Sequence, residues 1–290
     1  MNDISTDLVP TMSSFGGVPI SPIRDKPQFM KALIYGKPGV GKTTLVSQAS
    51  RIAGMAPVLF MTPDQAEADT LRKEAPQAQV AFIRRFSQFD DIYKAAAKLV
   101  GSGQPIPFKT FVIDTGTEAQ KLSMNDIMAQ LVISGRPGGG EVNFDVPAQR
   151  EWGESISQMR TLVRHFRDLP VNFIMTCHEA EAKDPRGQNW VVPDLPGKLK
   201  NQTAGMFSNV FYLAVERKVV PEGRSKIVEA ERRVLLTGLT EGFQAKSRTG
   251  LFERTVYDPK LEDLYKAIIS VPNDNVGVTA EELAKAGLVQ

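Results

Sequence analysis

The chain has 290 residues, 42% of them hydrophobic, and a formal net charge of +2 at pH 7. This length can bury one substantial α/β core, and no clear boundary separates two such cores. A single cysteine, Cys177, and two histidines exclude a disulfide framework and a Cys/His zinc cluster, which favours a reducing compartment. Neither an apolar run of about 20 residues nor a signal-peptide pattern occurs, so we expect a cytosolic protein without a membrane span.

The chain is expected to divide into an arm, a core and a tail. Residues 1–28 mix Pro, Ser and Gly without a sustained period and predict a flexible N-terminal arm. The core is expected over residues 29–254, and a C-terminal helical tail over 255–290. The small net charge means that any affinity for nucleic acid would come from local patches of the surface.

The segment GKPGVGKT at 36–43 fits the phosphate-binding P-loop pattern at every fixed position. The apolar strand 31–35 precedes it and a helical pattern follows, so its glycines can turn backbone N–H groups toward phosphate oxygens. Lys42 should reach the phosphates and Thr43 should ligate Mg²⁺. The alternative is a Gly-rich turn before a helix. The expected nucleotide-binding residues are Gly36, Lys37, Pro38, Gly39, Val40, Gly41, Lys42, Thr43 and Thr44.

Strands and helices alternate after the P-loop. The predicted strands are 58–62, 80–83, 111–114 and 171–176, and the predicted helices are 89–100, 118–133 and 152–166. This alternation predicts a parallel, doubly wound α/β sheet with helices on both faces. In the last helix the predicted buried stripe is Trp152, Ile156, Met159, Val163 and Phe166. A second stripe, either a solvated basic face or a DNA track, holds Arg160, Arg164 and Arg167.

The final third of the chain changes character. Short predicted strands at 210–215, 226–229, 233–237 and 243–246 suggest an antiparallel extension of the sheet. Two long segments, 135–147 and 179–197, are expected to be loops. An amphipathic helix is predicted near 261–269, and a capping box at Thr279 predicts a short last helix.

Polar residues follow two of the core strands. Asp114 ends the strand 111–114 at the position of a Walker-B carboxylate, where it would hold Mg²⁺ through water beside Thr43. Thr115 comes next, whereas AAA+ motors usually carry a catalytic Glu there, which argues against that class. His178 follows the strand 171–176 at the same edge of the sheet and is a candidate γ-phosphate sensor. Cys177 is interpreted as a small core residue.

Together these motifs resemble those of RecA-core ATPases, and among them the phage ATPases associated with single-strand annealing and recombination. The matching segments are GKPGVGKTT at 36–44, FVID ending at Asp114, TCHE ending at Glu179 and AKSRTG at 245–250. The resemblance implies a RecA-like fold, a doubly wound and mostly parallel sheet with an antiparallel C-terminal extension. It also implies ATP and Mg²⁺ as ligands.

The resemblance further implies which residues act on the phosphates. RecA-core ATPases carry a water-polarising carboxylate after the strand that follows the P-loop helix, where this chain has Asp64 and then Glu67. Asp64 is the first candidate and Glu67 the second, the alternative for Asp64 being a helix cap. The segment 245–250 is similar to the KNRFG-type motif of RadA and the Lys-x-Arg pair of KaiC- and DnaB-like hexamers. In those relatives both cations reach the neighbouring subunit's γ-phosphate.

By this resemblance Lys246 and Arg248 would act in trans in a homo-oligomer, either a ring or a filament. Ser247 and Thr249 depart from the motif, so only the charges and the glycine carry over, and an exposed basic turn is the alternative.

Single-stranded DNA is the partner that the resemblance implies, because loops equivalent to 135–147 and 179–197 line a DNA path in the family. Their cations and aromatics suit stacking on unpaired bases: Arg136, Phe144, Lys183, Arg186 and Trp190. They also hold Glu141, Asp145, Glu181 and Asp184. Three functions stay open, namely a DNA-binding ATPase of recombination, annealing or replication, a nucleotide switch that needs no DNA, and a small-molecule kinase.

Overall fold

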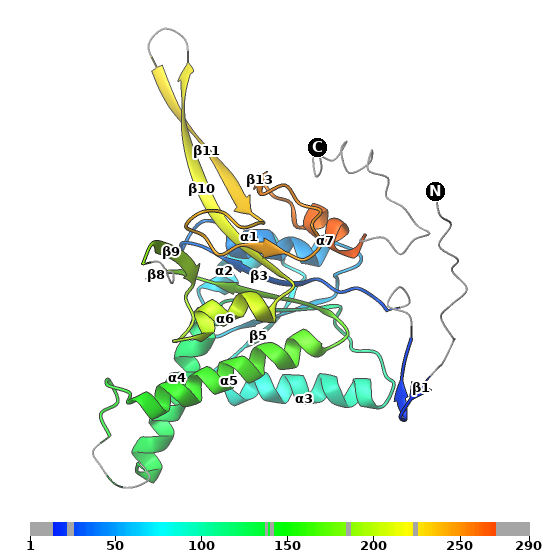
Figure 1. Cartoon of the computed structure of the whole chain (residues 1–290), viewed down its shortest axis with the longest axis vertical. Coiled ribbons are helices and arrows are strands. Elements are labelled where there is room, and N and C mark those ends of the chain that lie inside the picture. Colours follow the sequence, from blue (N-terminus) through cyan, green and yellow to red (C-terminus); the bar gives the residue numbers. More distant parts are fainter. Residues whose placement is uncertain are drawn as a thin grey trace.

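The computed structural model describes residues 14–21, 26–136, 139, 142–183, 187–222 and 226–270. Among these residues, nine strands form the main sheet in the order β13-β11-β10-β3-β7-β6-β4-β5, with β12 paired to β10 (Figure 1). The parallel core contains β3 (Lys31–Tyr35), β4 (Val58–Thr62), β5 (Gln79–Phe82), β6 (Thr110–Ile113) and β7 (Asn172–Cys177). The sheet is therefore mostly parallel, as the sequence predicted.

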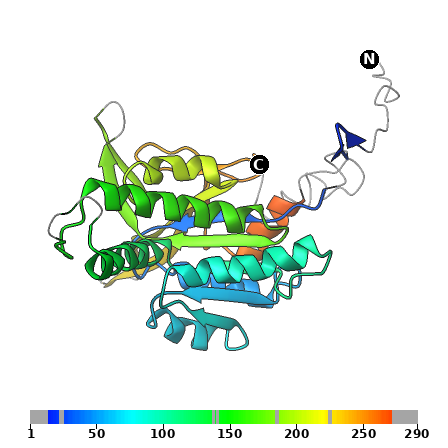
Figure 2. The same cartoon turned by 90° about the horizontal axis from the view of Figure 1, so that it is seen from below.

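Helices cover both faces of the sheet. One face carries α1 (Lys42–Ser47), the 3₁₀ turn η2 (Gln48–Arg51), α2 (Glu67–Glu74) and α7 (Leu261–Ile269). The other carries α3 (Ser87–Gly101), α4 (Gly116–Ser134), α5 (Gln149–Asp168) and α6 (Leu199–Met206). Alternate residues of β3 explain the two layers, since Ala32 and Ile34 face α1 whereas Leu33 and Tyr35 face α5. The helices α3 and α5 run alongside each other (Figure 2).

The C-terminal third adds the predicted antiparallel extension. The strand β10 (Asn209–Glu222) is parallel to β3 and antiparallel to β11 (Lys226–Leu236), and these two form a hairpin that projects from the body (Figure 1). The sequence predicted two strands at 226–229 and 233–237, but the structure has the single strand β11. Its eleven residues pair with β10 in unbroken register, which overrides the polar residues between the two apolar segments.

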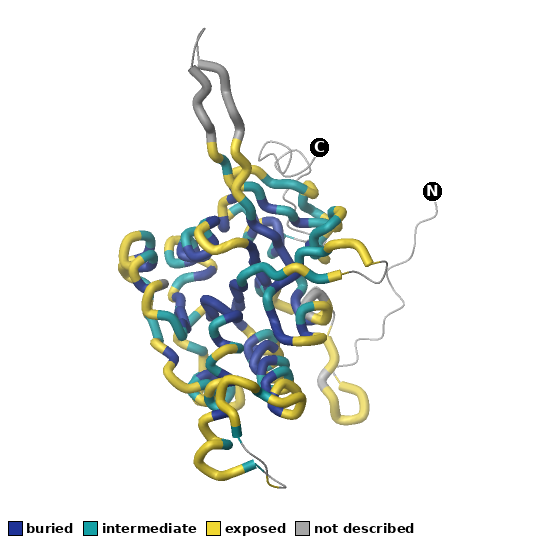
Figure 3. The backbone as a smooth tube through the Cα atoms, turned by 90° about the vertical axis from the view of Figure 1, so that its left-hand side faces the viewer, coloured by how far each residue is buried: buried dark blue, intermediate teal, exposed yellow. Residues whose placement is uncertain are grey.

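Two further expectations are corrected. Residues 179–197 were expected to be a loop, but β8 (Glu179–Lys183) and β9 (Asn189–Pro193) form an antiparallel hairpin. Trp152 was expected in the buried stripe of α5, but its side chain is 41% exposed, while Met159, Val163 and Phe166 are buried as predicted. Buried residues gather over the middle of the molecule and exposed ones toward its ends (Figure 3).

Residues assigned by sequence to the tail join this same body. The strand β13 (Thr255–Tyr257) pairs with β11, and α7 buries Leu261, Leu264 and Ile268 beside the P-loop helix. In the expected arm, β1 (Ser14–Phe15) and β2 (Val18–Pro19) pair only with each other. The predicted capping box at Thr279 lies outside the described residues. Among the helices that the structure describes, none is long and apolar enough to cross a bilayer.

Candidate functional site

The segment 36–43 forms a loop between β3 and α1. Gly41 takes the N-cap position of α1 with φ of 94°, a conformation that favours glycine, and its carbonyl accepts the N–H of Leu45 at 2.9 Å. The Lys42 ammonium donates to the carbonyl oxygens of Gly36 and Lys37, each at 2.9 Å, and both Lys42 and Thr43 are buried. A buried cation is thus held across a loop that opens a helix, an arrangement suited to phosphate.

Gly36 is required by its contact with the next strand. A β-carbon at this position would lie 2.1 Å from the carbonyl oxygen of Leu213 in β10. The loop therefore leaves the sheet in close contact with the β10–β11 hairpin, and no side chain fits between them.

Asp114 lies at the same edge of the sheet, directly after β6. Its side chain is fully buried and accepts a hydrogen bond from the hydroxyl of Thr176 in β7. The strand β7 lies between β3 and β6, so the P-loop and Asp114 are two strands apart. A buried carboxylate and a P-loop Thr hydroxyl at one edge of the sheet supply the oxygen ligands that Mg²⁺ prefers. Thr43 and Asp114 are thus the residues that could hold this ion.

Thr115 has a structural role. Its hydroxyl accepts the N–H of Glu118 at 3.1 Å and so caps α4. AAA+ motors usually carry a catalytic Glu at this position. Here the Thr115 side chain caps α4 instead.

Asp64 follows β4, next to Asp114's strand in the sheet. Its Oδ1 accepts the N–H of Ala66 at 2.9 Å, and its carbonyl accepts the hydroxyl of Thr62 at 2.8 Å. The N-cap of α2 is Ala66, without a side-chain cap, so Asp64 shapes the turn before the helix instead of capping it. Glu67 is the first residue of α2, and its side chain lies outside the described part of the structure.

His178 joins a polar network at the end of β7. Its N–H donates to the hydroxyl of Thr117 at 3.0 Å, and that hydroxyl donates to the carbonyl of Asp194 at 3.0 Å. The Asp194 N–H in turn donates to the His178 carbonyl at 2.8 Å. This network connects the start of α4 and the residue after β9 to the His178 backbone. Cys177 beside it is fully buried, and this burial raises the pKa of its thiol to about 12, as befits a core residue.

Lys246 and Arg248 lie away from the P-loop of their own chain. Lys246 is in β12 (Lys246–Ser247), opposite Val210 of β10, which pairs with Leu33 of β3. Gly36 directly follows β3, three residues beyond Leu33, and is two strands away from β12, about 10 Å in each direction. Partial burial lowers the pKa of Lys246, and the nearby charge of Arg248 lowers it further. The Arg248 side chain itself is exposed.

The predicted DNA-facing groups are spread over two regions. Arg160, Arg164 and Arg167 line a shallow groove of about 470 Å³ between α5 and α6, and Arg160 donates to Gln202 at 3.1 Å. In the segment before α5, the Phe144 side chain is 46% exposed. Trp190 in β9 is half-buried and its indole nitrogen is shielded from water. Arg186, Glu141 and Asp184 lie outside the described residues.

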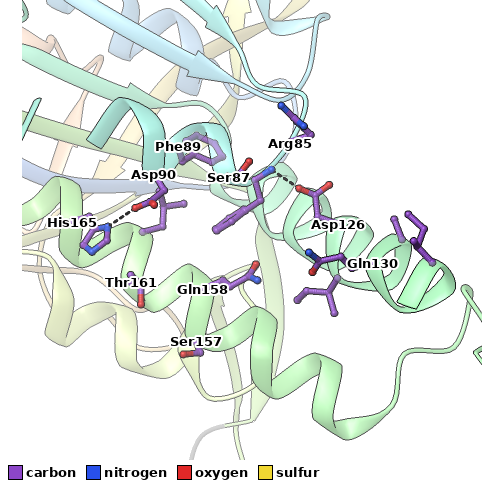
Figure 4. A pocket seen from close by; sticks show the side chains of 15 residues that line it. Arg85, Ser87, Phe89, Asp90, Asp126, Gln130, Ser157, Gln158, Thr161 and His165 are labelled. Atoms are coloured by element: carbon purple, nitrogen blue, oxygen red, sulfur yellow. Dashed lines mark hydrogen bonds and ion pairs between the residues drawn. The ribbon is translucent and has the colours of Figure 1, made fainter. Parts of the chain in front are cut away.

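A larger groove of about 760 Å³ lies between α3, α4 and α5 (Figure 4). It is on the face of the sheet opposite α1. Asp126 on its wall accepts the N–H of Phe86 at 2.6 Å, and His165 lies 3.6 Å from Asp90. Asp126 is ten residues along α4 from Gly116, about 15 Å from the sheet edge that holds Asp114.

A model of the family described as "AAA domain" matches residues 28–249. This chain belongs to the AAA domain family. The match covers the loop, Asp114, His178 and both Lys246 and Arg248, and it supports a P-loop nucleotide-binding domain. No curated protein matches the chain.

Two solved structures are similar in part. One is the flagellar accessory protein FlaH from Methanocaldococcus jannaschii, with 10% identity over 82% of this chain and 89% of that chain, at a TM-score of 0.37. The other is an ATPase from the type III secretion system of pathogenic bacteria, with 14% identity over 64% of this chain and 52% of that chain, at a TM-score of 0.41. Both scores lie below 0.5, so neither structure bears on what this chain binds.

Sequence reasoning missed several polar residues at this edge, namely Thr117, Thr176 and Asp194. Each is a common residue type that acquires its partner only when strands far apart in sequence become neighbours. The one available signal was their place at or just beyond strand ends.

Proposed function

We propose that this chain is a Mg²⁺-dependent ATPase of the RecA-core type that binds single-stranded DNA in recombination, annealing or replication. The observation that carries the ATPase part is the buried Lys42 of the P-loop at the same sheet edge as the buried Asp114. Membership in the AAA domain family supports nucleotide binding. The DNA part depends on the resemblance to phage annealing ATPases and on the exposed cations and Phe144.

The residues divide the work of hydrolysis as follows. The loop N–H groups and Lys42 bind the phosphates, and Thr43 with Asp114 holds Mg²⁺. The bound ion neutralises charge on the phosphate oxygens. Asp64, with Glu67 as the alternative, orients the attacking water, and His178 monitors the γ-phosphate. This assignment leaves positioning and electrostatics as the main contributions of the protein.

The kinase alternative lacks support from the cavities. A kinase needs an acceptor pocket within reach of the γ-phosphate. The groove between α3, α4 and α5 is on the sheet face opposite α1, and it begins about 15 Å along α4 from the edge. This groove is larger than the one between α5 and α6, but it lies too far from the P-loop edge to hold a phosphoryl acceptor. The nucleotide switch is the remaining alternative, and DNA-stimulated turnover separates it from the proposal.

The test is ATP hydrolysis with and without single-stranded DNA. Lys42→Ala should abolish nucleotide binding and turnover, because the loop loses the cation that faces the phosphates. Lys98→Ala is the matched control, since Lys98 is an exposed lysine of α3 and its loss should leave turnover unchanged. Hydrolysis by a folded Lys42→Ala protein at the wild-type rate would contradict the ATPase assignment. If single-stranded DNA neither binds the wild type nor changes its rate of ATP hydrolysis, the nucleotide-switch alternative is favoured.

A further inference from the structure

Arg233 of β11 lies directly against the P-loop of its own chain. A β-carbon at Gly41 would come within 2.7 Å of Arg233 Nε, 2.9 Å of Nη2 and 3.0 Å of Cζ. The guanidinium therefore occupies the space that a side chain at Gly41 would need. Gly41 is thus required twice, for its positive φ and for the space that the guanidinium fills.

Two features of the fold bring Arg233 to this place: the alternation of side chains along β11, and hydrogen bonds between its backbone and Asp258. Leu235, two residues on, is buried with Val40 on the α1 face of the sheet, so Arg233 is on that same face at the rim. Its N–H donates to Asp258 Oδ1 at 3.1 Å, and the Asp258 N–H donates to its carbonyl at 2.8 Å. The start of the side chain is therefore fixed while its end reaches the loop.

The neighbouring Arg232 shows what a structural arginine looks like here. It points to the other face, pairs with Glu216 at 2.6 Å and stacks on Tyr257 at 3.6 Å. Arg233 is exposed and, with the described residues, makes no ion pair. A guanidinium and the Lys42 ammonium at one loop repel each other, a cost that an anion bound between them would offset.

We propose that Arg233 is a cis-acting phosphate-binding residue of this site, a second fixed cation beside Lys42. The inference rests on the proposed binding of ATP. Gly41 directly precedes Lys42, so a guanidinium on Gly41 is beside the same phosphates, and its planar fork suits two phosphate oxygens at once. Lys246, by contrast, is level with Leu33 in the middle of β3 and two strands away from it, so its backbone lies farther from the loop than the Arg233 guanidinium.

The experiment measures the dissociation constants of ATP, ADP and AMP, with Mg²⁺, for the wild type and three variants. Arg233→Gln should weaken ATP and ADP binding about tenfold or more and leave AMP binding within about twofold, because AMP lacks the phosphates that the loop holds. Arg233→Lys should lose less affinity for ATP and ADP than Arg233→Gln, since lysine keeps the positive charge but lacks the planar, two-pronged guanidinium. Arg232→Gln is the matched control and should stay within about twofold for all three nucleotides. Thermal melting checks that each variant is folded.

Three outcomes would overturn the inference. If the wild type binds ATP and Arg233→Gln binds it equally well, Arg233 is not a phosphate ligand and the ATPase proposal stands. If Arg233→Gln weakens AMP binding as much as ATP binding, Arg233 contacts the nucleoside or stabilises the loop conformation instead of binding the β- and γ-phosphates. If the wild type does not bind ATP at all, the proposed function fails together with this inference.

Discussion

Asp64 and Glu67 offer two carboxylates for one catalytic task. Asp64→Asn should leave ATP binding intact and slow hydrolysis by about 10²-fold or more, because an amide cannot polarise water as a carboxylate does. Glu67→Gln is the matched variant three residues away. Measuring the ATP dissociation constant first, and then the single-turnover hydrolysis rate, separates an effect on binding from an effect on the chemical step in each variant. If Asp64→Asn turns over normally and Glu67→Gln does not, the catalytic role belongs to Glu67.

Individual residues differ in how far the sequence reveals them. The positions of Lys42 and Thr43 at the start of α1 were predictable, because the P-loop pattern lies within eight consecutive positions. Asp114 was predictable from its place after an apolar strand. Arg233 was not, because its contact with Gly41 joins positions almost 200 residues apart and depends on which strand lies beside β3. The nearest sequence signal, two adjacent arginines in a strand, does not say which of them faces the loop.

The junction of β3 and β10 tolerates no side chain at Gly36. In Gly36→Ala the new methyl would meet the carbonyl oxygen of Leu213 at 2.1 Å, so β10 must move, at a cost of about 3 kcal/mol in the free energy of unfolding. Gly39→Ala in the same loop faces open space and should cost only the strain of its φ of 80°, about 1 kcal/mol. Denaturant unfolding without nucleotide measures both. If the two variants lose the same free energy of unfolding, the close contact between Gly36 and β10 does not determine the cost of the substitution.

The segment between α4 and α5 and the β8–β9 hairpin carry the DNA prediction. Phe144 is 46% exposed, whereas the indole nitrogen of Trp190 is shielded, so Phe144 is the better stacking surface. Phe144→Ala should weaken single-stranded DNA binding by about 1–3 kcal/mol, and Trp190→Ala by less. Titration of a labelled oligonucleotide with ATP and Mg²⁺ tests this. A larger loss for Trp190→Ala would assign the stacking to β9.

Elements were predictable where their own periodicity decided them. The helix α7 was expected near 261–269, where an apolar stripe repeats every three to four residues, and it spans Leu261–Ile269. The hairpin β8–β9 was not, because its residues are mixed polar and small, and only pairing between its strands makes them extended. The exposure of Trp152 had a similar cause, since helical spacing shows which residues share a face but not where along the helix its neighbours end.

The proposed homo-oligomer can be tested by mixing subunits. If Lys246 and Arg248 act across an interface, Arg248→Ala should bind nucleotide yet hydrolyse it poorly. A mixture of Arg248→Ala with Lys42→Ala subunits should then recover part of the activity, because an intact P-loop can meet an intact Arg248. Mixed oligomers of Arg233→Ala and Lys42→Ala are the control. At an ATP concentration that does not saturate Arg233→Ala, mixing should bring no recovery, since both changes weaken the P-loop of their own subunit.

The mixing experiment requires the solution mass of each sample. No recovery in verified mixed oligomers, or full activity in a strict monomer, would identify 245–250 as a surface turn. The backbone of Lys246, opposite Val210, lies about 10 Å from its own loop both along and across the strands, which favours an effect in trans.

The β10–β11 hairpin has a mechanical consequence for the whole molecule. Both of its strands press on the P-loop at their base, one through the Leu213 carbonyl at Gly36 and the other through Arg233 at Gly41. From Leu213 to Glu222 the ribbon runs for about 30 Å beyond that support. A rotation of the hairpin about this base would therefore move its far end the most. If ATP binds at the loop as proposed, a tilt of about 5° at this base on binding would displace the far end of the hairpin by about 2.6 Å over that length.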